Sequence, residues 1–160
     1  HPLVQDADVI NLHWVANFLD WPSFFSGIKK PIVWTLHDMN PFLGGFHYKN
    51  DVKRNLYVFS HLDHKLKKIK QKAISKANQI TIVCLTGWLK ELSKDSEILG
   101  SIPHHLIPNS INLNIFKQYQ QDFAREVFAL PKYKKIILFV SQNTNNNRKG
   151  LDLLAEAFEK

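Results

Sequence analysis

A histidine and an aspartate stand next to each other where a run of apolar residues ends. Residues 32–36 are Ile-Val-Trp-Thr-Leu, and His37 and Asp38 follow directly. β-branched and aromatic residues without a polar break are typical of a buried parallel strand. The two titratable side chains are followed by Gly44 and Gly45, and glycine lets backbone approach a ligand closely. The stretch therefore indicates a ligand site, although a His-Asp pair at the end of a strand also occurs in ordinary turns.

A second group of polar residues lies near the end of the chain. The loop at residues 141–150 begins with Ser141 and ends with Arg148, Lys149 and Gly150, just before a helical pattern. Free backbone N–H groups, the positive end of a helix dipole and two cationic side chains can together hold a phosphate or a diphosphate. The loop has neither the Walker P-loop pattern nor a Gly-x-Gly-x-x-Gly dinucleotide fingerprint. A solvated surface is the competing interpretation of the same residues.

These residues need elements that position them, and the chain alternates strand and helix patterns. We expect strands at residues 9–12, 32–36, 80–85, 105–107 and 135–140. We expect helical segments at residues 18–28, 62–77, 87–92, 96–99, 123–130 and 151–158, with Thr86 as an N-cap. The alternation predicts an α/β fold, a Rossmann-like parallel sheet with flanking helices. Ligands of such sheets bind at the carboxyl ends of the strands, which is where His37 and Asp38 would lie.

Composition limits the classes of protein to consider. The chain has 160 residues, of which 44% are hydrophobic and 12% aromatic, as in a globular domain with a substantial core. Its formal net charge of +7 suits a nucleic acid, an anionic membrane or a phosphorylated ligand. Basic residues gather at 65–72 on an expected helix, and a solvated face and a membrane or polyanion contact are the two interpretations. No run of apolar residues in the sequence is long enough to span a membrane.

The spacing of cysteine and histidine argues against a metal centre. Cys84 is the only cysteine, which excludes a disulfide framework and a zinc cluster of cysteines within the chain. Its apolar surroundings predict a core residue of a reduced, intracellular protein. We expect no metal site, because ligand spacing is missing around His47, His61, His64, His104 and His105.

Four motifs, in order along the chain, point to one family. They are Asp-Val-Ile-Asn-Leu-His-Trp at residues 8–14, Pro-Ile-Val-Trp-Thr-Leu-His-Asp-Met at 31–39 with Gly-Gly-Phe-His-Tyr at 44–48, Ile-Pro-Asn-Ser-Ile at 107–111, and Ile-Ile-Leu-Phe-Val at 136–140 leading to Arg-Lys-Gly-Leu-Asp-Leu-Leu at 148–154. On these motifs, which cover nearly the whole chain, the sequence resembles glycosyltransferase family 4. More narrowly, it is similar to the bacterial polysaccharide-type members that have a Trp-Thr-Leu-His-Asp strand end.

The resemblance implies a two-domain GT-B glycosyltransferase that retains anomeric configuration and needs no metal ion or other cofactor. Residues 1–108 would be the second half of the acceptor-side domain, 109–131 the interdomain linker, and 132–160 the first strand and helix of the donor-side domain. We therefore expect a central fragment of a longer cytoplasmic protein, peripheral on the inner face of the membrane. Its substrates would be a nucleotide diphosphate sugar and a saccharide or lipid-linked acceptor.

The resemblance also gives roles to individual residues. His37 matches a histidine near the transferred sugar, and Asp38 would orient it or bind acceptor. Gly44 and Gly45 match a glycine loop that lies against acceptor or donor, and Trp14 would line the acceptor cleft. In the donor-side domain, Lys149 matches a lysine that neutralises the departing diphosphate, with Arg148 and Ser141 beside it.

Three departures from the family pattern bear on activity. Ser141 and Gln142 stand where the family commonly has Gly-Arg, and Phe46 replaces a frequent cysteine. The paired glutamates seven residues apart that hold the donor belong to a later segment, so we expect no transfer by this chain alone. A non-catalytic sugar-binding or nucleotide-binding module is the alternative. A basic nucleic-acid-binding domain is disfavoured, because the run at residues 65–72 lacks interleaved aromatics.

Overall fold

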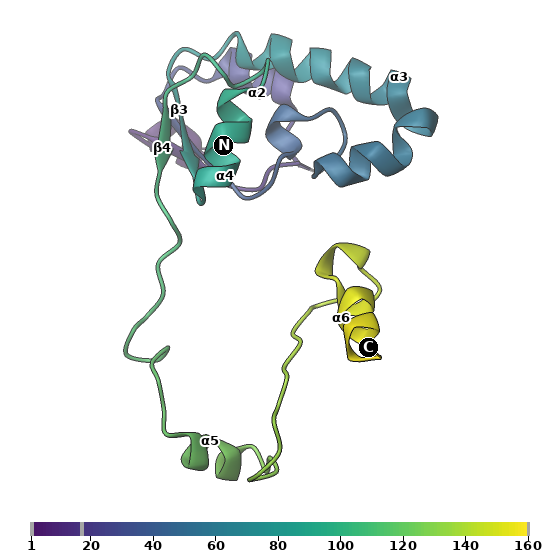
Figure 1. Cartoon of the computed structure of the whole chain (residues 1–160). Coiled ribbons are helices and arrows are strands. Elements are labelled where there is room, and N and C mark those ends of the chain that lie inside the picture. The colour runs from purple at the N-terminus through teal and green to yellow at the C-terminus, as the bar shows by residue number, and fades with distance from the viewer. Residues whose placement is uncertain (1, 17, 160) are drawn as a thin grey trace. The chain divides into compact units, whose positions relative to one another are not determined.

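The computed structural model describes residues 2–16 and 18–159. The chain divides into two units, one that ends at Ser110 and one that begins at Ile111 (Figure 1). The first unit holds the sheet and the longest helix, and the second holds two short helices joined by loops.

The first unit is built on a parallel sheet of four strands in the order β1-β2-β3-β4. The strands are β1 (Ile10–Leu12), β2 (Ile32–Leu36), β3 (Ile80–Cys84) and β4 (His104–Leu106). Leu12 lies opposite Trp34, Trp34 opposite Ile82, and Ile82 opposite His104. All strands therefore end at the same edge of the sheet. The predicted α/β fold, a parallel sheet with flanking helices consistent with a Rossmann-like arrangement, is confirmed.

Two of the helices described for the first unit begin at a capping side chain. The helical elements of this unit are α1 (Pro2–Asp6), α2 (Trp21–Gly27), the 3-10 turn η1 (Asn40–Phe42), α3 (Lys49–Ile74) and α4 (Gly87–Lys94). The Asp20 carboxylate accepts from the backbone N–H of Ser23 and caps α2. The predicted N-cap of α4 is confirmed, because the Thr86 hydroxyl accepts from the backbone N–H of Leu89 at 3.2 Å.

Helix α3 is longer than the sequence predicts. The expected helix spans residues 62–77, whereas α3 already begins at Lys49. Its inner end buries Lys70, Ala73 and Ile74, while the side chains of residues 56–62 are exposed. The three-to-four spacing of apolar residues marks only the part of a helix that packs on a core, so the outer part was not recognised.

The core is aromatic and lies between the sheet and its helices. Trp34 and Phe25 are fully buried, and the ring of Trp21 meets that of Trp34 edge-on at 4.9 Å between centroids. Cys84 is fully buried at the end of β3, and burial raises the pKa of its thiol to about 11. The predicted core position of the cysteine is thus confirmed.

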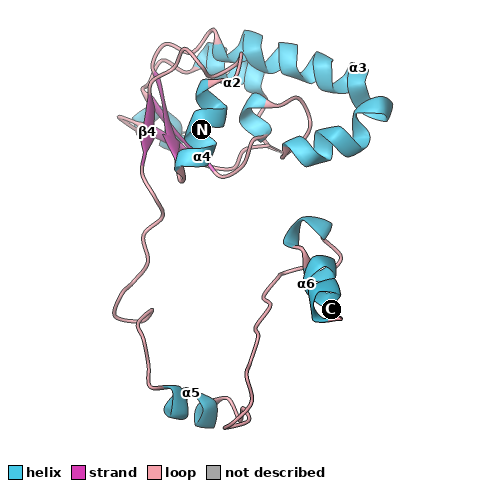
Figure 2. Ribbon diagram, in the orientation of Figure 1, coloured by secondary structure: helices cyan, strands magenta, loops and turns pink. Residues whose placement is uncertain are grey.

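The second unit contains α5 (Gln121–Val127), the 3-10 turn η2 (Asn147–Lys149) and α6 (Leu151–Phe158). The predicted strand at residues 135–140 is wrong, since these residues form no strand and are drawn as loop in Figure 2. Leu138 is 81% exposed and Val140 78%. A strand needs a neighbour for its backbone hydrogen bonds, and the described residues of this unit provide none for this apolar run.

Candidate functional site

The imidazole of His37 lies just beyond the carboxyl end of β2 and is exposed. Its Nε2 is 2.9 Å from Nδ1 of His13, which follows β1. The register of the two parallel strands brings the two histidines together. Leu12 and Trp34 are paired, and the segments after β1 and β2 leave the sheet at the same edge. One of the two facing nitrogens donates and the other accepts, so the pair holds one proton between them. Sequence reasoning did not select His13, although its place after a neighbouring strand was the available signal.

Asp38 points away from solvent and has a different set of partners from the one expected. Its Oδ2 lies 2.6 Å from Nδ1 of His47 and accepts from the indole N–H of Trp14 at 3.2 Å. Its Oδ1 accepts from the backbone N–H of Asn40 at 2.9 Å. In the described structure Asp38 is bonded to His47, Trp14 and the Asn40 backbone, whereas His37 is bonded to His13. That Asp38 orients His37 or binds acceptor stays a prediction.

The aromatic rings of this site form a small stack. The rings of Trp14 and His47 lie nearly parallel, 6.0 Å apart with an interplanar angle of 19°. The indole N–H of Trp34 donates to the backbone carbonyl of His13 at 3.1 Å and so fixes the end of β1. Trp14, a predicted site residue, thus lies beside Asp38. His47 was not predicted to belong to the site, although it follows the predicted glycine loop.

A buried lysine holds the loop between η1 and α3. Nζ of Lys70 donates to the backbone carbonyls of Asn40 at 2.6 Å, Leu43 at 3.0 Å and Gly44 at 2.6 Å, and to Oδ1 of Asn40 at 3.1 Å. Burial lowers the pKa of Lys70 to about 8, although Asp63 and Asp38 act in the opposite direction. The ammonium is therefore charged at pH 7. The interpretation of residues 65–72 as a solvated basic face is wrong for Lys70.

Of the two glycines of this loop, Gly44 is buried against α3 and Gly45 is exposed. The backbone N–H of Gly45 donates to Oδ1 of Asp63 on α3 at 2.8 Å. A Cβ on Gly44 would lie 2.2 Å from both the backbone carbonyl oxygen and Oδ1 of Asp63. Close packing against α3 is thus one reason for glycine at position 44. Contact of Gly44 and Gly45 with an acceptor or donor stays a prediction.

A narrow hollow opens between β1, β2 and η1. Its volume is about 10 Å³, and its polar lining includes His13, Trp14, His37 and Asp38. That volume admits about one water-sized group, which is also the size of a single hydroxyl. A larger ligand would therefore contact the exposed imidazole of His37 from outside and place at most one hydroxyl in the hollow.

The predicted phosphate residues lie in the second unit. The Ser141 hydroxyl donates to the backbone carbonyl of Asn143 at 2.9 Å. Arg148 and Lys149 are exposed in η2, directly before α6, and Nε of Arg148 donates to Oδ1 of Asn146 at 3.4 Å. Gly150 caps α6 with φ of 71°, a conformation that favours glycine. As the sequence predicts, a polar loop leads through Arg148 and Lys149 directly into the start of a helix.

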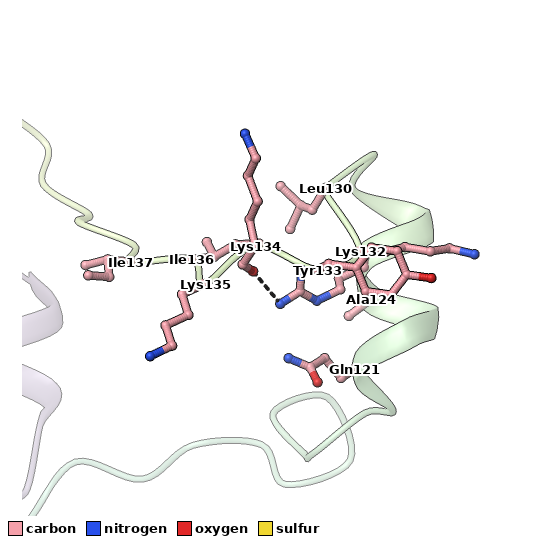
Figure 3. Close-up of a pocket in the computed structure, with 10 residues that line it drawn as sticks. Gln121, Ala124, Leu130, Lys132, Tyr133, Lys134, Lys135, Ile136 and Ile137 are labelled. Carbon is pink, nitrogen blue, oxygen red and sulfur yellow. Dashed lines mark hydrogen bonds between the residues drawn. The ribbon is translucent and has the colours of Figure 1, made fainter.

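An open hollow of 670 Å³ in the second unit has basic residues around it, shown in Figure 3. The side chains of Lys132, Lys134 and Lys135 point in different directions there. The guanidinium of Arg125 donates to the backbone carbonyls of Pro131 and Lys134. These cations do not converge on one point, and the hollow has no geometry for binding a single anion.

Fold and site together define an α/β protein whose parallel sheet carries imidazole, carboxylate and indole groups at its carboxyl edge. No protein-family model, no curated protein and no solved structure matches the chain. Within residues 2–16 and 18–159, no three His, Cys, Asp or Glu side chains are grouped to hold a metal ion. None of the helices described for this chain has the length and apolar character needed to cross a membrane.

Proposed function

We propose that this chain is part of a retaining glycosyltransferase of the GT-B type. The protein would move a sugar from a nucleotide diphosphate sugar to a saccharide or lipid-linked acceptor in the cytoplasm, in the synthesis of a bacterial surface polysaccharide. The observation that carries the proposal is the exposed imidazole of His37, fixed by His13 at the carboxyl edge of the sheet. The ordered motifs of the sequence support it.

The site has groups suited to sugar hydroxyls. A neutral imidazole at position 37 can accept or donate one hydrogen bond, and the contact with His13 limits how its ring can turn. Asp38 is tied to His47, Trp14 and the Asn40 backbone, so it holds this edge of the site rigid. Sugar transfer depends on such fixed groups, because they bring donor and acceptor into one geometry without further ordering.

The donor would be held by the loop that precedes α6. Arg148 and Lys149 bring two positive charges to the helix start, and Ser141 adds a hydroxyl at the other end of the loop. Lys149 would stabilise the leaving diphosphate, a role that a metal ion has in other transferases. These assignments rest on the resemblance and on the order of the residues in the loop.

The test is a His37→Ala variant of the complete natural protein. Release of nucleoside diphosphate from a panel of UDP-, GDP- and ADP-hexoses is measured with and without saccharide acceptors. Loss of a fixed hydrogen-bonding group at the reacting sugar is expected to lower kcat at least about a hundredfold. His64→Ala, an exposed histidine on α3, is the matched control and should keep the wild-type rate. An unchanged rate in His37→Ala removes this residue from the mechanism.

A binding module without catalysis is the second candidate, and Gln142 in place of a basic residue favours it. Calorimetry with UDP, GDP and ADP separates the two. Binding without release of nucleoside diphosphate supports the module, whereas turnover supports the transferase. In either case Lys149→Gln should weaken diphosphate binding, and Lys132→Gln, an exposed lysine of the same unit, should not. Equal affinity in Lys149→Gln contradicts the phosphate assignment.

A further inference from the structure

The outer part of α3 exposes large apolar side chains on every side of the helix. Four consecutive residues are exposed: Leu56 by 41%, Tyr57 by 85%, Val58 by 57% and Phe59 by 46%. Leu62 follows about one turn after Val58 and is 51% exposed. Four consecutive residues go once around a helix, so this stretch cannot be the partly covered face of a core helix. Figure 1 shows α3 continuing well past the sheet.

An apolar hollow adjoins this stretch. Its volume is 180 Å³, and it is lined by Phe59, Leu62 and Leu66 from α3 and by Gly45 and Phe46 from the preceding loop. The polar residue at its wall, Asp63, has its Oδ1 bonded to the backbone N–H of Gly45. The hollow therefore offers apolar surface that is continuous with the exposed side chains of α3.

Positive charge flanks the apolar stretch on both sides. Exposed basic residues precede it at Lys49, Lys53 and Arg54 and follow it at Lys65 and Lys68. The two acidic residues of α3 are Asp51 and Asp63. We call residues 56–62, Phe46 and these five basic residues the α3 outer surface.

We propose that the α3 outer surface docks on an anionic lipid bilayer. Apolar and aromatic side chains enter the boundary between headgroups and acyl chains, while lysine and arginine reach the anionic headgroups around them. A second copy of the chain would bring the same positive charges against each other, which disfavours self-association through this surface. A nucleic acid would meet the charges but leave the apolar side chains without a partner. This inference does not depend on the proposed sugar transfer.

The experiment is co-sedimentation of the protein with vesicles of phosphatidylcholine, with and without phosphatidylglycerol. We expect binding to the anionic vesicles that weakens as salt is added, and much weaker binding to phosphatidylcholine alone. Lys53→Gln combined with Arg54→Gln should weaken partitioning at least tenfold, because each cation near an anionic surface contributes about fivefold. Tyr57→Ser combined with Phe59→Ser should also weaken it at least tenfold.

Tyr133→Ser is the matched control, because Tyr133 is 98% exposed in the second unit. This variant should bind vesicles as the wild type does, and equal urea midpoints for all variants would show that folding is unchanged. Absence of vesicle binding by the wild type, or equal binding by the α3 variants, overturns the proposal. It is also overturned if the α3 variants instead abolish a dimer seen without lipid, or if the surface binds oligonucleotides and not vesicles.

Discussion

Replacing Lys70 with methionine removes the cation that holds the loop before α3, and its effect on stability can be estimated. The substitution leaves three acceptors without their donor, the backbone carbonyls of Leu43 and Gly44 and Oδ1 of Asn40, while the Asn40 carbonyl keeps the backbone N–H of Leu43. Each lost partner in a buried site costs about 2 kcal/mol. Burial lowers the pKa of Lys70 from 10.5 to about 8, a desolvation cost of about 3 kcal/mol that methionine does not have. The expected net loss is therefore about 3 kcal/mol at pH 7.

The same lysine makes stability depend on pH. Between pH 8 and 10.5 the unfolded chain keeps the proton of Lys70 and the folded chain has lost it, so the free energy of unfolding rises with pH in this window. At pH 7 the lysine is protonated in both states and contributes no slope. The difference between wild type and Lys70→Met should therefore grow from pH 7 to pH 10.

Urea unfolding followed by tryptophan fluorescence measures both effects, since Trp21 lies 5.0 Å from Nζ of Lys70. Lys68→Met is the matched control, because Lys68 is exposed on the same helix, and its unfolding midpoint should equal that of the wild type. Equal midpoints for wild type and Lys70→Met would refute the structural role of the lysine. A difference that shrinks toward pH 10 would refute the lowered pKa.

Three further predictions concern the first unit. Gly44→Ala should lower the free energy of unfolding by about 2 kcal/mol, because its Cβ would meet Asp63 at 2.2 Å, whereas Gly27→Ala, with nothing within 4 Å, should not lower it in the same urea titration. Burial lowers the pKa of His104, so the stability that this histidine contributes is present above pH 6.5 and is lost as the pH falls below that value. The free energy of unfolding of His104→Gln should therefore fall less than that of the wild type between pH 7 and pH 5. An equal fall in both proteins would contradict the lowered pKa of His104. Cys84 is fully buried with its pKa raised to about 11, so iodoacetamide should label it only in urea, and rapid labelling of the native protein, read by mass spectrometry, would show that the core opens.

Elements that depend on local chemistry could be predicted from the sequence. The strands at Ile32–Leu36 and Ile80–Cys84 are short β-branched runs, and the start of α4 at Thr86 is a capping hydroxyl. The run at residues 135–140 has the same composition, yet it forms no strand, because composition does not supply a neighbour for pairing. Local pattern thus fixes the type of an element only when the sheet around it is present.

The candidate site was predictable only in part for the same reason. His37, Asp38 and Trp14 could be selected because each follows a predicted strand or its turn. The contact of His37 with His13 depends on the register of two strands, which the sequence does not state. The role of Lys70 depends on burial, and in the sequence it looks like any other lysine of a basic run.

The order of the strands has a consequence for when the site forms during synthesis. Each strand pairs with its neighbour in sequence, and the side chains of the site come from one stretch that ends at His47. The lysine that fixes the intervening loop is residue 70, so it leaves the ribosome after all of them. The histidines and Asp38 would therefore emerge before the clamp that sets their loop, and the site would become rigid only once the inner end of α3 has docked. Slow docking of this helix would delay binding even in a chain whose sheet is already paired.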